Sequence, residues 1–168
     1  MSALVSTIRD LHRRKARERR ALALAEGIRL VEEALAAGVT ITGVVVGPAL
    51  DATPRGKALR GALDAARVPS EPATEAELVE LADTEHPQGV VAVVSPRAWV
   101  AADIRATVAH PVVVLDGVQD PGNVGTIART ALAFGAAGLV ALPGTADLLN
   151  PKALRGSMGA LFRLPALQ

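Results

Sequence analysis

The spacing of apolar side chains along the chain predicts an alternation of helices and strands. A stripe of Leu4, Ile8 and Leu11 predicts a helix over residues 2–13. Further helices are predicted over residues 28–37, 56–66 and 74–82, and strands over residues 40–46 and 90–94. Residues 21–25 fit either a strand or a helix, and residues 68–73 either a connection or an edge strand. This order of elements is typical of an α/β layer fold.

The second half of the chain repeats this alternation. An apolar run over residues 112–115 predicts a buried strand, and a turn-rich segment follows it. A helix is predicted over residues 123–134, a strand over residues 138–142, a helix over residues 150–161 and a strand-like start over residues 162–164. In open α/β sheets, ligands bind beyond the carboxyl ends of the strands. We therefore expect chemistry in the polar loop after residue 115.

The helix over residues 123–134 has two faces. The side chains predicted to face the sheet are Val124, Ile127, Ala128, Ala131 and Phe134. The other face carries Gly122, Gly125, Thr126 and Arg129. Its glycines would let a ligand approach the backbone, where the helix N-terminus favours an anion. Asn123 is the expected N-cap. On this pattern alone, Arg129 fits a phosphate or ribose contact and a surface salt bridge equally well.

A second polar motif lies in the helix predicted over residues 150–161. Lys152, Arg155 and Ser157 stand among small residues there. Gly156 and Gly159 would each cost about 1 kcal/mol in a helix interior relative to alanine. Such glycines indicate close packing or a nearby ligand, and a glycine-rich loop without a ligand is an equal alternative.

Composition narrows the class of protein. Of the 168 residues, 50% are hydrophobic and 21% are charged, which is typical of a globular protein. The absence of cysteine excludes disulfides, thiolate catalysis and zinc–thiolate sites. The three histidines, His12, His86 and His110, have no metal-like spacing, so no metal is expected. No apolar run has the length of a membrane span or a signal peptide, and we expect a soluble cytoplasmic protein.

The net charge of +1 conceals a basic cluster near the N-terminus. The cluster comprises Arg9, Arg13, Arg14, Lys15, Arg17, Arg19 and Arg20. Only Asp10 and Glu18 oppose it within the same segment. Such a cluster fits either a solvated helix face or a polyanion contact. The scarcity of acidic partners favours nucleic acid.

The loop and helix after residue 115 resemble a known signature. The segment Asp116-Gly117-Val118-Gln119-Asp120-Pro121-Gly122-Asn123-Val124-Gly125, followed by Arg129-Thr130-Ala131 and Phe134-Gly135, resembles the first motif of the SpoU (TrmH) family of RNA ribose 2′-O-methyltransferases. Asn150-Pro151-Lys152 through Arg155-Gly156-Ser157-Met158-Gly159 is similar to the segment that follows in that family.

The N-terminal half carries the same resemblance. Arg14-Lys15-Ala16-Arg17, Ala25-Glu26-Gly27, Glu32-Glu33-Ala34-Leu35 and His86-Pro87-Gln88-Gly89-Val90 are similar to the family's RNA-substrate-binding domain, a small α/β sandwich related to ribosomal proteins. The resemblance implies an RNA-binding domain over residues 1–95, a linker over residues 96–110, and the first part of a Rossmann-like, trefoil-knot methyltransferase domain over residues 111–168.

The resemblance implies transfer of a methyl group from S-adenosylmethionine to a ribose 2′-hydroxyl of ribosomal or transfer RNA, by a homodimer. Asn123 and Arg129 match the family's motif asparagine and catalytic arginine. The family arginine is described as the base. Because a guanidinium is effectively always protonated, we favour an orienting and alkoxide-stabilising cation.

RNA contacts are expected from the basic cluster and from the second polar motif. The residues concerned are Arg13, Arg14, Lys15, Arg17, Arg19, Arg20, Lys152, Arg155 and Ser157. The Gly-Pro-Glu-Gly-type and Ser-Leu-Asn segments that form most of the family's cofactor pocket do not occur. We therefore expect an incomplete catalytic domain whose cofactor-binding residues cannot be named. The alternative is an RNA-binding protein of this family without activity.

Overall fold

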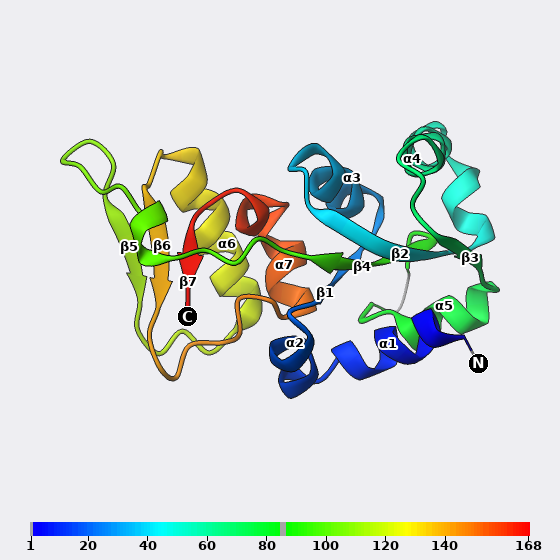
Figure 1. Cartoon of the computed structure of the whole chain (residues 1–168), viewed down its shortest axis with the longest axis horizontal. Coiled ribbons are helices and arrows are strands. Elements are labelled where there is room, and N and C mark those ends of the chain that lie inside the picture. The colour runs from blue at the N-terminus through cyan, green and yellow to red at the C-terminus, as the bar shows by residue number, and fades with distance from the viewer. Residues whose placement is uncertain (1, 85–86) are drawn as a thin grey trace. The chain divides into compact units, whose positions relative to one another are not determined.

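The computed structural model describes residues 2–84 and 87–168, so His86 lies outside the described residues. The chain divides into two units, Met1–Pro96 and Arg97–Gln168. Each is a layered arrangement of helices on a sheet (Figure 1). The α/β class predicted from the sequence is confirmed. No helix among the described residues is long and apolar enough to span a membrane.

The first unit is built on a four-stranded mixed sheet. Its strands lie in the order β1 (Ala23–Glu26), β4 (Val90–Ser95), β2 (Thr40–Val46) and β3 (Ser70–Pro72). β4 is antiparallel to both neighbours, and β3 is parallel to β2. Residues 21–25, whose sequence fits either a strand or a helix, thus contribute to strand β1. β3 is an edge strand. Pro72 lacks a backbone N–H, and at the edge of the sheet no second neighbouring strand needs that donor.

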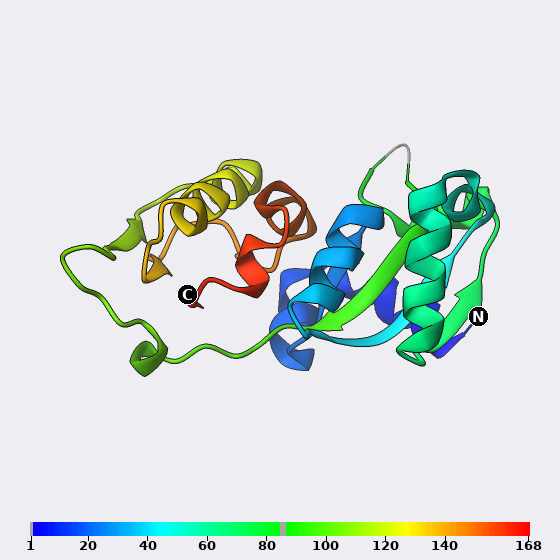
Figure 2. The same ribbon diagram turned by 90° about the horizontal axis from the view of Figure 1, so that it is seen from above.

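Helices cover both faces of this sheet. α1 (Ala3–Leu11) and α5 (Glu75–Leu81) lie on one face, and α3 (Ile28–Ala36) and α4 (Pro54–Ala65) on the other (Figures 1 and 2). Between α1 and α5 and the sheet, the buried core comprises Ile8, Leu11, Leu24, Val45, Leu78, Leu81, Val91 and Val93. Its helical members recur every three or four residues, which is the spacing that predicted the helices.

Local capping determines where these helices begin. The Ser2 side chain accepts a hydrogen bond from Val5 N at the start of α1. A capping box is present at the start of α5, because Thr74 N donates to Glu77 Oε2 at 2.8 Å and Glu77 N donates to Thr74 Oγ1 at 3.3 Å. A short 3₁₀ helix, Pro48–Ala52, lies between β2 and α4.

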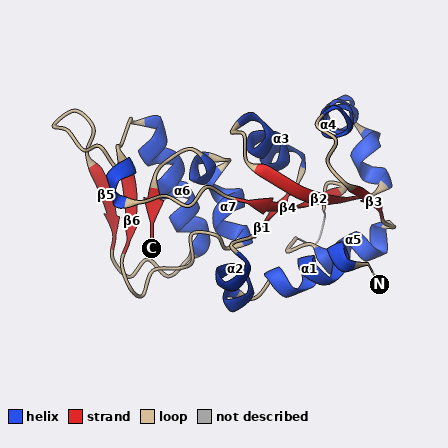
Figure 3. Cartoon of the chain, in the orientation of Figure 1, coloured by secondary structure: helices blue, strands red, loops and turns tan. Residues whose placement is uncertain are grey.

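The second unit contains a three-stranded parallel sheet. The strands lie in the order β5 (Val112–Leu115), β6 (Gly138–Ala141) and β7 (Ala166–Leu167). α6 (Pro121–Ala133) and α7 (Pro151–Ser157) lie on one side of these strands, as Figure 3 shows. Val124, Ala128 and Ala131 are the α6 side chains that are buried, as predicted.

Several features of this unit differ from the prediction. The helix predicted to extend to residue 161 ends at Ser157, because Met158 and Gly159 adopt positive φ angles of 53° and 87°. A 3₁₀ turn, Ala160–Phe162, follows it, and strand β7 begins only at Ala166, so the strand-like start over residues 162–164 is wrong. Phe134 does not face the sheet. It follows the last helical residue and its side chain is 84% exposed.

Candidate functional site

The N-terminus of α6 is organised by Asp120. Asp120 Oδ1 accepts a hydrogen bond from Asn123 N at 2.9 Å, and Asp120 Oδ2 accepts one from Lys152 Nζ at 2.9 Å. The hydrogen bond from Lys152, with that from the Asn123 backbone, lowers the pKa of the Asp120 carboxyl below its usual range. The prediction that Asn123 is the N-cap is therefore wrong, because Asp120 caps the helix. The helix begins at Pro121, whose missing N–H costs nothing at a first helical position.

The glycines of the two polar motifs mark a close contact between α6 and α7. A Cβ atom on Gly125 would lie 2.3 Å from the carbonyl oxygen of Ala153 and 2.7 Å from Ser157 N. A Cβ atom on Gly156 would lie 3.2 Å from the carbonyl oxygen of Gly122. The glycine face predicted to admit a ligand is thus covered by α7. For Gly156 the sequence left close packing and a nearby ligand as alternatives, and the structure shows close packing.

Asn123 and Arg129 lie on the exposed side of α6. Thr126 and Thr130 are also exposed, and the Thr130 hydroxyl donates to the Thr126 carbonyl oxygen at 2.9 Å. Arg129 comes six positions after Asn123, a rise of about 9 Å along the helix. Within residues 2–84 and 87–168, the side chains of Asn123 and Arg129 have no hydrogen-bond or ion-pair partner. An amide and a cation are thus exposed on the same helix, about 120° apart around its axis.

The polar side chains of α7 separate into different environments. Lys152 is engaged with Asp120, although its side chain remains 51% exposed. Arg155 is half-buried. Ser157 is fully buried, and its hydroxyl donates to the Leu154 carbonyl oxygen at 2.8 Å. The expectation that Ser157 contacts RNA is therefore wrong for this structure, because its hydroxyl is bonded within its own helix and does not reach the surface.

The carboxyl ends of β5 and β6 carry an ordered loop. The buried Thr145 hydroxyl donates to the Leu115 carbonyl oxygen at 3.1 Å. Gln168 Oε1 accepts from Leu148 N at 3.0 Å, and Gln168 Nε2 donates to the Thr145 carbonyl oxygen at 3.2 Å. These contacts are not predictable from the sequence, because Gln168 lies 20 residues or more from its partners and no local pattern links them.

Two glycine turns lie beside this loop. Gly117 has a φ of 64° and Gly144 a φ of 88°, both unfavourable for other residues. Apart from its two chain neighbours, no described residue has an atom within 4 Å of a Cβ position on Gly117. A Cβ atom on Gly144 would lie 3.7 Å from the Gly117 Cα atom. Backbone is therefore accessible at the edge of the sheet where α/β proteins bind ligands.

An apolar hollow of about 310 Å³ lies between α6 and β5. Its lining residues are Pro111, Val113, Thr126, Ile127, Thr130, Ala131, Phe134 and Ala136. None of these side chains is charged, so the hollow does not match a phosphate. The largest exposed side chain around it is Phe134.

The basic cluster of the first unit lies at the corner between α1 and α2 (Arg14–Arg20). Arg13, Arg14, Lys15, Arg19 and Arg20 are exposed. Arg17 is only 2% exposed, and its Nη1 atom donates to the carbonyl oxygens of Leu11 at 2.8 Å and His12 at 2.9 Å. The expectation that Arg17 contacts RNA is wrong for this structure, because its guanidinium joins the two helices from inside.

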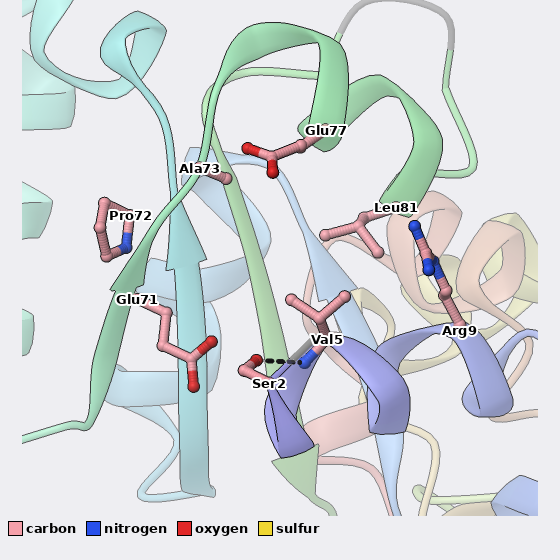
Figure 4. A pocket seen from close by; sticks show the side chains of 8 residues that line it. All are labelled: Ser2, Val5, Arg9, Glu71, Pro72, Ala73, Glu77 and Leu81. Carbon is pink, nitrogen blue, oxygen red and sulfur yellow. Dashed lines mark hydrogen bonds between the residues drawn. The ribbon is translucent and has the colours of Figure 1, made fainter.

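A second hollow, of about 360 Å³, lies between α1, β3 and α5 (Figure 4). Its lining residues are Ser2, Val5, Arg9, Glu71, Pro72, Ala73, Glu77 and Leu81. Hydrogen bonds from the Thr74 backbone and hydroxyl lower the pKa of the Glu77 carboxyl, which is thus ionised at neutral pH. With Arg9 paired to Glu80 at 3.1 Å, the two carboxylates of the lining disfavour an RNA phosphate. No group of His, Asp or Glu side chains among the described residues could hold a metal ion.

Both units match known protein families. Residues 3–92 match the MRM3-like substrate binding domain family, and residues 110–168 match the SpoU rRNA Methylase family. The chain belongs to the SpoU methylase family, with an MRM3-like substrate-binding domain as its first unit. The resemblance found in the sequence is thereby confirmed.

Relatives and solved structures agree with this assignment. The chain is 32% identical over 168 residues to the 23S rRNA (guanosine(2553)-2′-O)-methyltransferase RlmP of Bacillus subtilis, covering 95% of the chain and 59% of that protein. It is similar to the SpoU methyltransferase AviRb from Streptomyces viridochromogenes in complex with AdoMet, with a TM-score of 0.86, 30% identity, and coverage of 99% of the chain and 63% of AviRb.

An AdoMet-bound rRNA methyltransferase from Sinorhizobium meliloti matches with a TM-score of 0.82 and 31% identity, covering 99% of the chain and 61% of that protein. The chain thus spans about three fifths of the length of these three relatives.

Proposed function

We propose that a protein containing this chain transfers a methyl group from S-adenosylmethionine to a ribose 2′-hydroxyl of RNA. The observation that carries the proposal is the exposed Asn123 and Arg129 pair on α6, within a segment that matches the SpoU family. A relative of this chain is named as a 2′-O-methyltransferase of 23S rRNA. We infer ribosomal or transfer RNA as the substrate class and the cytoplasm as the place of action.

Arg129 is proposed as the catalytic residue that meets the reacting ribose. Loss of the 2′-hydroxyl proton leaves negative charge on oxygen, and a guanidinium beside that oxygen stabilises the charge. Since guanidinium groups stay protonated, the proton passes to another acceptor, such as an RNA phosphate or water. Asn123 has an amide that can donate to the ribose and accept from it, which suits an orienting role.

The methyl donor is proposed to bind at the carboxyl edge of β5 and β6. S-adenosylmethionine supplies an electrophilic methyl group on a positively charged sulfur. The accessible backbone at Gly117 and Gly144 fits the close approach of a ligand. We assign no side chain of this chain to the methyl donor.

Both units are proposed to bind RNA by contacting its phosphates and recognising the shape of the RNA helix, because A-form RNA exposes 2′-hydroxyls and little readable sequence. The proposed contacts are Arg13, Arg14, Lys15, Arg19, Arg20, Lys152 and Arg155. Arg17 and Ser157 are left out because both are buried. A homodimer is also proposed, and the exposed Phe134 beside an apolar hollow supports a protein contact there.

The proposal is tested by incubating the protein, expressed from its complete reading frame, with methyl-labelled S-adenosylmethionine and total ribosomal or transfer RNA. We expect label in RNA with the unaltered protein. We expect an at least 100-fold lower rate with Arg129→Ala at unchanged RNA affinity, as is typical when a charge-stabilising group is removed, about 10²–10³-fold. RNA binding without transfer would favour the alternative of an inactive RNA-binding protein, and the absence of both would overturn the proposal.

A further inference from the structure

Three arginines of the α1–α2 corner converge on one carboxylate. Asp10, in the last turn of α1, accepts hydrogen bonds from Arg13, from Arg19 Nη2 at 3.0 Å and from Arg20 Nε at 3.1 Å. The Asp10 side chain is only 15% exposed, although it lies in the most basic segment of the chain. We call these four residues the Asp10 cluster. The cluster is a defined arrangement, whereas a solvated charge run would have independent side chains.

The backbone of the corner explains how Arg19 and Arg20 reach Asp10. Arg13 is extended, with φ −89° and ψ 130°, and α2 starts immediately after it. The buried guanidinium of Arg17 then ties α2 to the carbonyl oxygens at the end of α1. This closure turns the last residues of α2 back toward α1. Arg17 thus acts on the cluster through the backbone and not through its own charge.

The charges of the cluster leave an excess of positive potential at the surface. Burial raises the pKa of the Asp10 carboxyl, but the hydrogen bonds from Arg20 and Arg13 outweigh that effect and lower it, so the group is ionised at neutral pH. Three guanidiniums and one carboxylate carry a net charge of +2. The Arg13 and Arg19 side chains are 76% and 68% exposed, so most of their N–H donors face solvent.

We propose that Asp10 is a positioning residue that gathers Arg13, Arg19 and Arg20 into one binding site for an RNA backbone phosphate. A phosphodiester accepts several hydrogen bonds from planar guanidinium forks, and forks held in place lose less side-chain entropy on binding. This inference rests on the proposed function and deepens it, because it assigns a phosphate site within the basic segment and names Asp10 as the residue that positions its arginines.

The proposal makes a prediction opposite to that of simple charge counting. Asp10→Asn and Glu18→Gln each remove one negative charge from the same segment. Glu18 is 57% exposed and accepts from Arg14 Nε at 2.7 Å, outside the Asp10 cluster. If the basic segment acts only through its net charge, both variants should bind RNA more tightly than the unaltered chain by the same factor. If Asp10 organises the site, the two variants should diverge.

The test is fluorescence anisotropy of a labelled RNA hairpin with the 168-residue chain, at several salt concentrations. We expect Glu18→Gln to bind as tightly as the unaltered chain or more tightly. We expect Asp10→Asn to bind about threefold more weakly than Glu18→Gln, consistent with exposed ion pairs being worth up to about 1 kcal/mol. Asp10→Glu, which keeps a carboxylate, should recover part of the loss.

Exposed-surface variants keep the proposal testable even if Asp10→Asn unfolds, which circular dichroism would reveal. Arg13→Gln and Arg19→Gln should each reduce the salt dependence of binding by about one counterion, whereas Lys57→Gln on α4 should not. Equal affinities for Asp10→Asn and Glu18→Gln, or unchanged salt dependence in the arginine variants, would overturn the inference and leave the proposed function intact. Absence of RNA binding by the unaltered chain would also overturn the inference, whereas the proposed function is overturned only if protein expressed from the complete reading frame shows neither RNA binding nor methyl transfer.

Discussion

Lys152 Nζ lies 2.9 Å from Asp120 Oδ2 and so joins α7 to the capping residue of α6. The same carboxylate holds Asn123 N through its other oxygen. Lys152, expected from the sequence to contact RNA, therefore also fixes the start of the helix that carries Asn123 and Arg129. The two segments similar to SpoU motifs meet at this ion pair.

Breaking this pair should cost little stability and should change the titration of Asp120. Both side chains are about half exposed, so we expect Lys152→Met to lower Tm by only about 2 °C. Asp120→Ala removes the helix cap as well and should lower Tm by about 5 °C. Thermal unfolding followed by circular dichroism measures both, with Lys57→Met as the control. Equal losses for Lys152→Met and Asp120→Ala would contradict the capping role.

The lowered pKa of Asp120 also sets the sign of a pH dependence. Because the carboxyl titrates lower in the folded chain than in the unfolded chain, its stabilisation is complete above the unfolded value of about 3.9. The stabilisation is lost as pH falls through the lowered folded value. Carboxyl ¹³C shifts should show the Asp120 pKa rising toward the ordinary value in Lys152→Met. An unchanged titration in that variant would show that Lys152 is not the main cause.

Gly125 is predicted to be intolerant of any side chain. An added Cβ would meet backbone atoms of α7 at 2.3 and 2.7 Å, which no side-chain rotation relieves. We expect Gly125→Ala to destabilise the second unit by about 2 kcal/mol or more, even though alanine favours helix. Gly61→Ala is the matched control, because Gly61 lies in α4 with no described atom within 4 Å of its Cβ position. It should stabilise by about 0.5–1 kcal/mol, and a neutral Gly125→Ala would argue against the close helix contact.

Arg17 should behave as a structural residue despite its place in a basic cluster. Replacing it by methionine leaves the Leu11 and His12 carbonyl oxygens without its guanidinium, and we expect a loss of about 2 kcal/mol in the free energy of unfolding. Arg14→Met, at an exposed neighbour, should stay within about 0.5 kcal/mol of the unaltered chain. Urea unfolding measures both. Similar small effects would mean that the buried contact of Arg17 is not formed in solution.

Elements with a clear apolar period were predictable from the sequence, whereas the start of α6 and the end of α7 were not. α1, α3, β2 and β4 lie where the periodicity placed them, because burial of one face determines both the period and the fold. The start of α6 was missed because Asp120 and Asn123 are both good capping residues. The Asp-Pro order, with proline at the first helical position, was the available signal.

The roles of single polar residues were harder to predict. Arg17 and Ser157 belong to the expected residue types for RNA binding, but both are buried by contacts with nearby backbone carbonyls. Nothing in a basic run distinguishes the one arginine that turns inward, since that depends on how α2 folds back on α1. Phe134 continued the apolar period of α6, but the helix ends before it and its side chain turns to solvent.

The position of the transferred methyl group tests the central claim most directly. Protein expressed from its complete reading frame is incubated with methyl-labelled S-adenosylmethionine and RNA, and the RNA is then hydrolysed with alkali. Alkaline cleavage needs a free 2′-hydroxyl, so a ribose 2′-O-methyl group leaves the label in alkali-resistant dinucleotides. We predict that the label appears there with the unaltered protein and not with Arg129→Ala. Label in mononucleotides would place the methyl group on a base and would contradict the account.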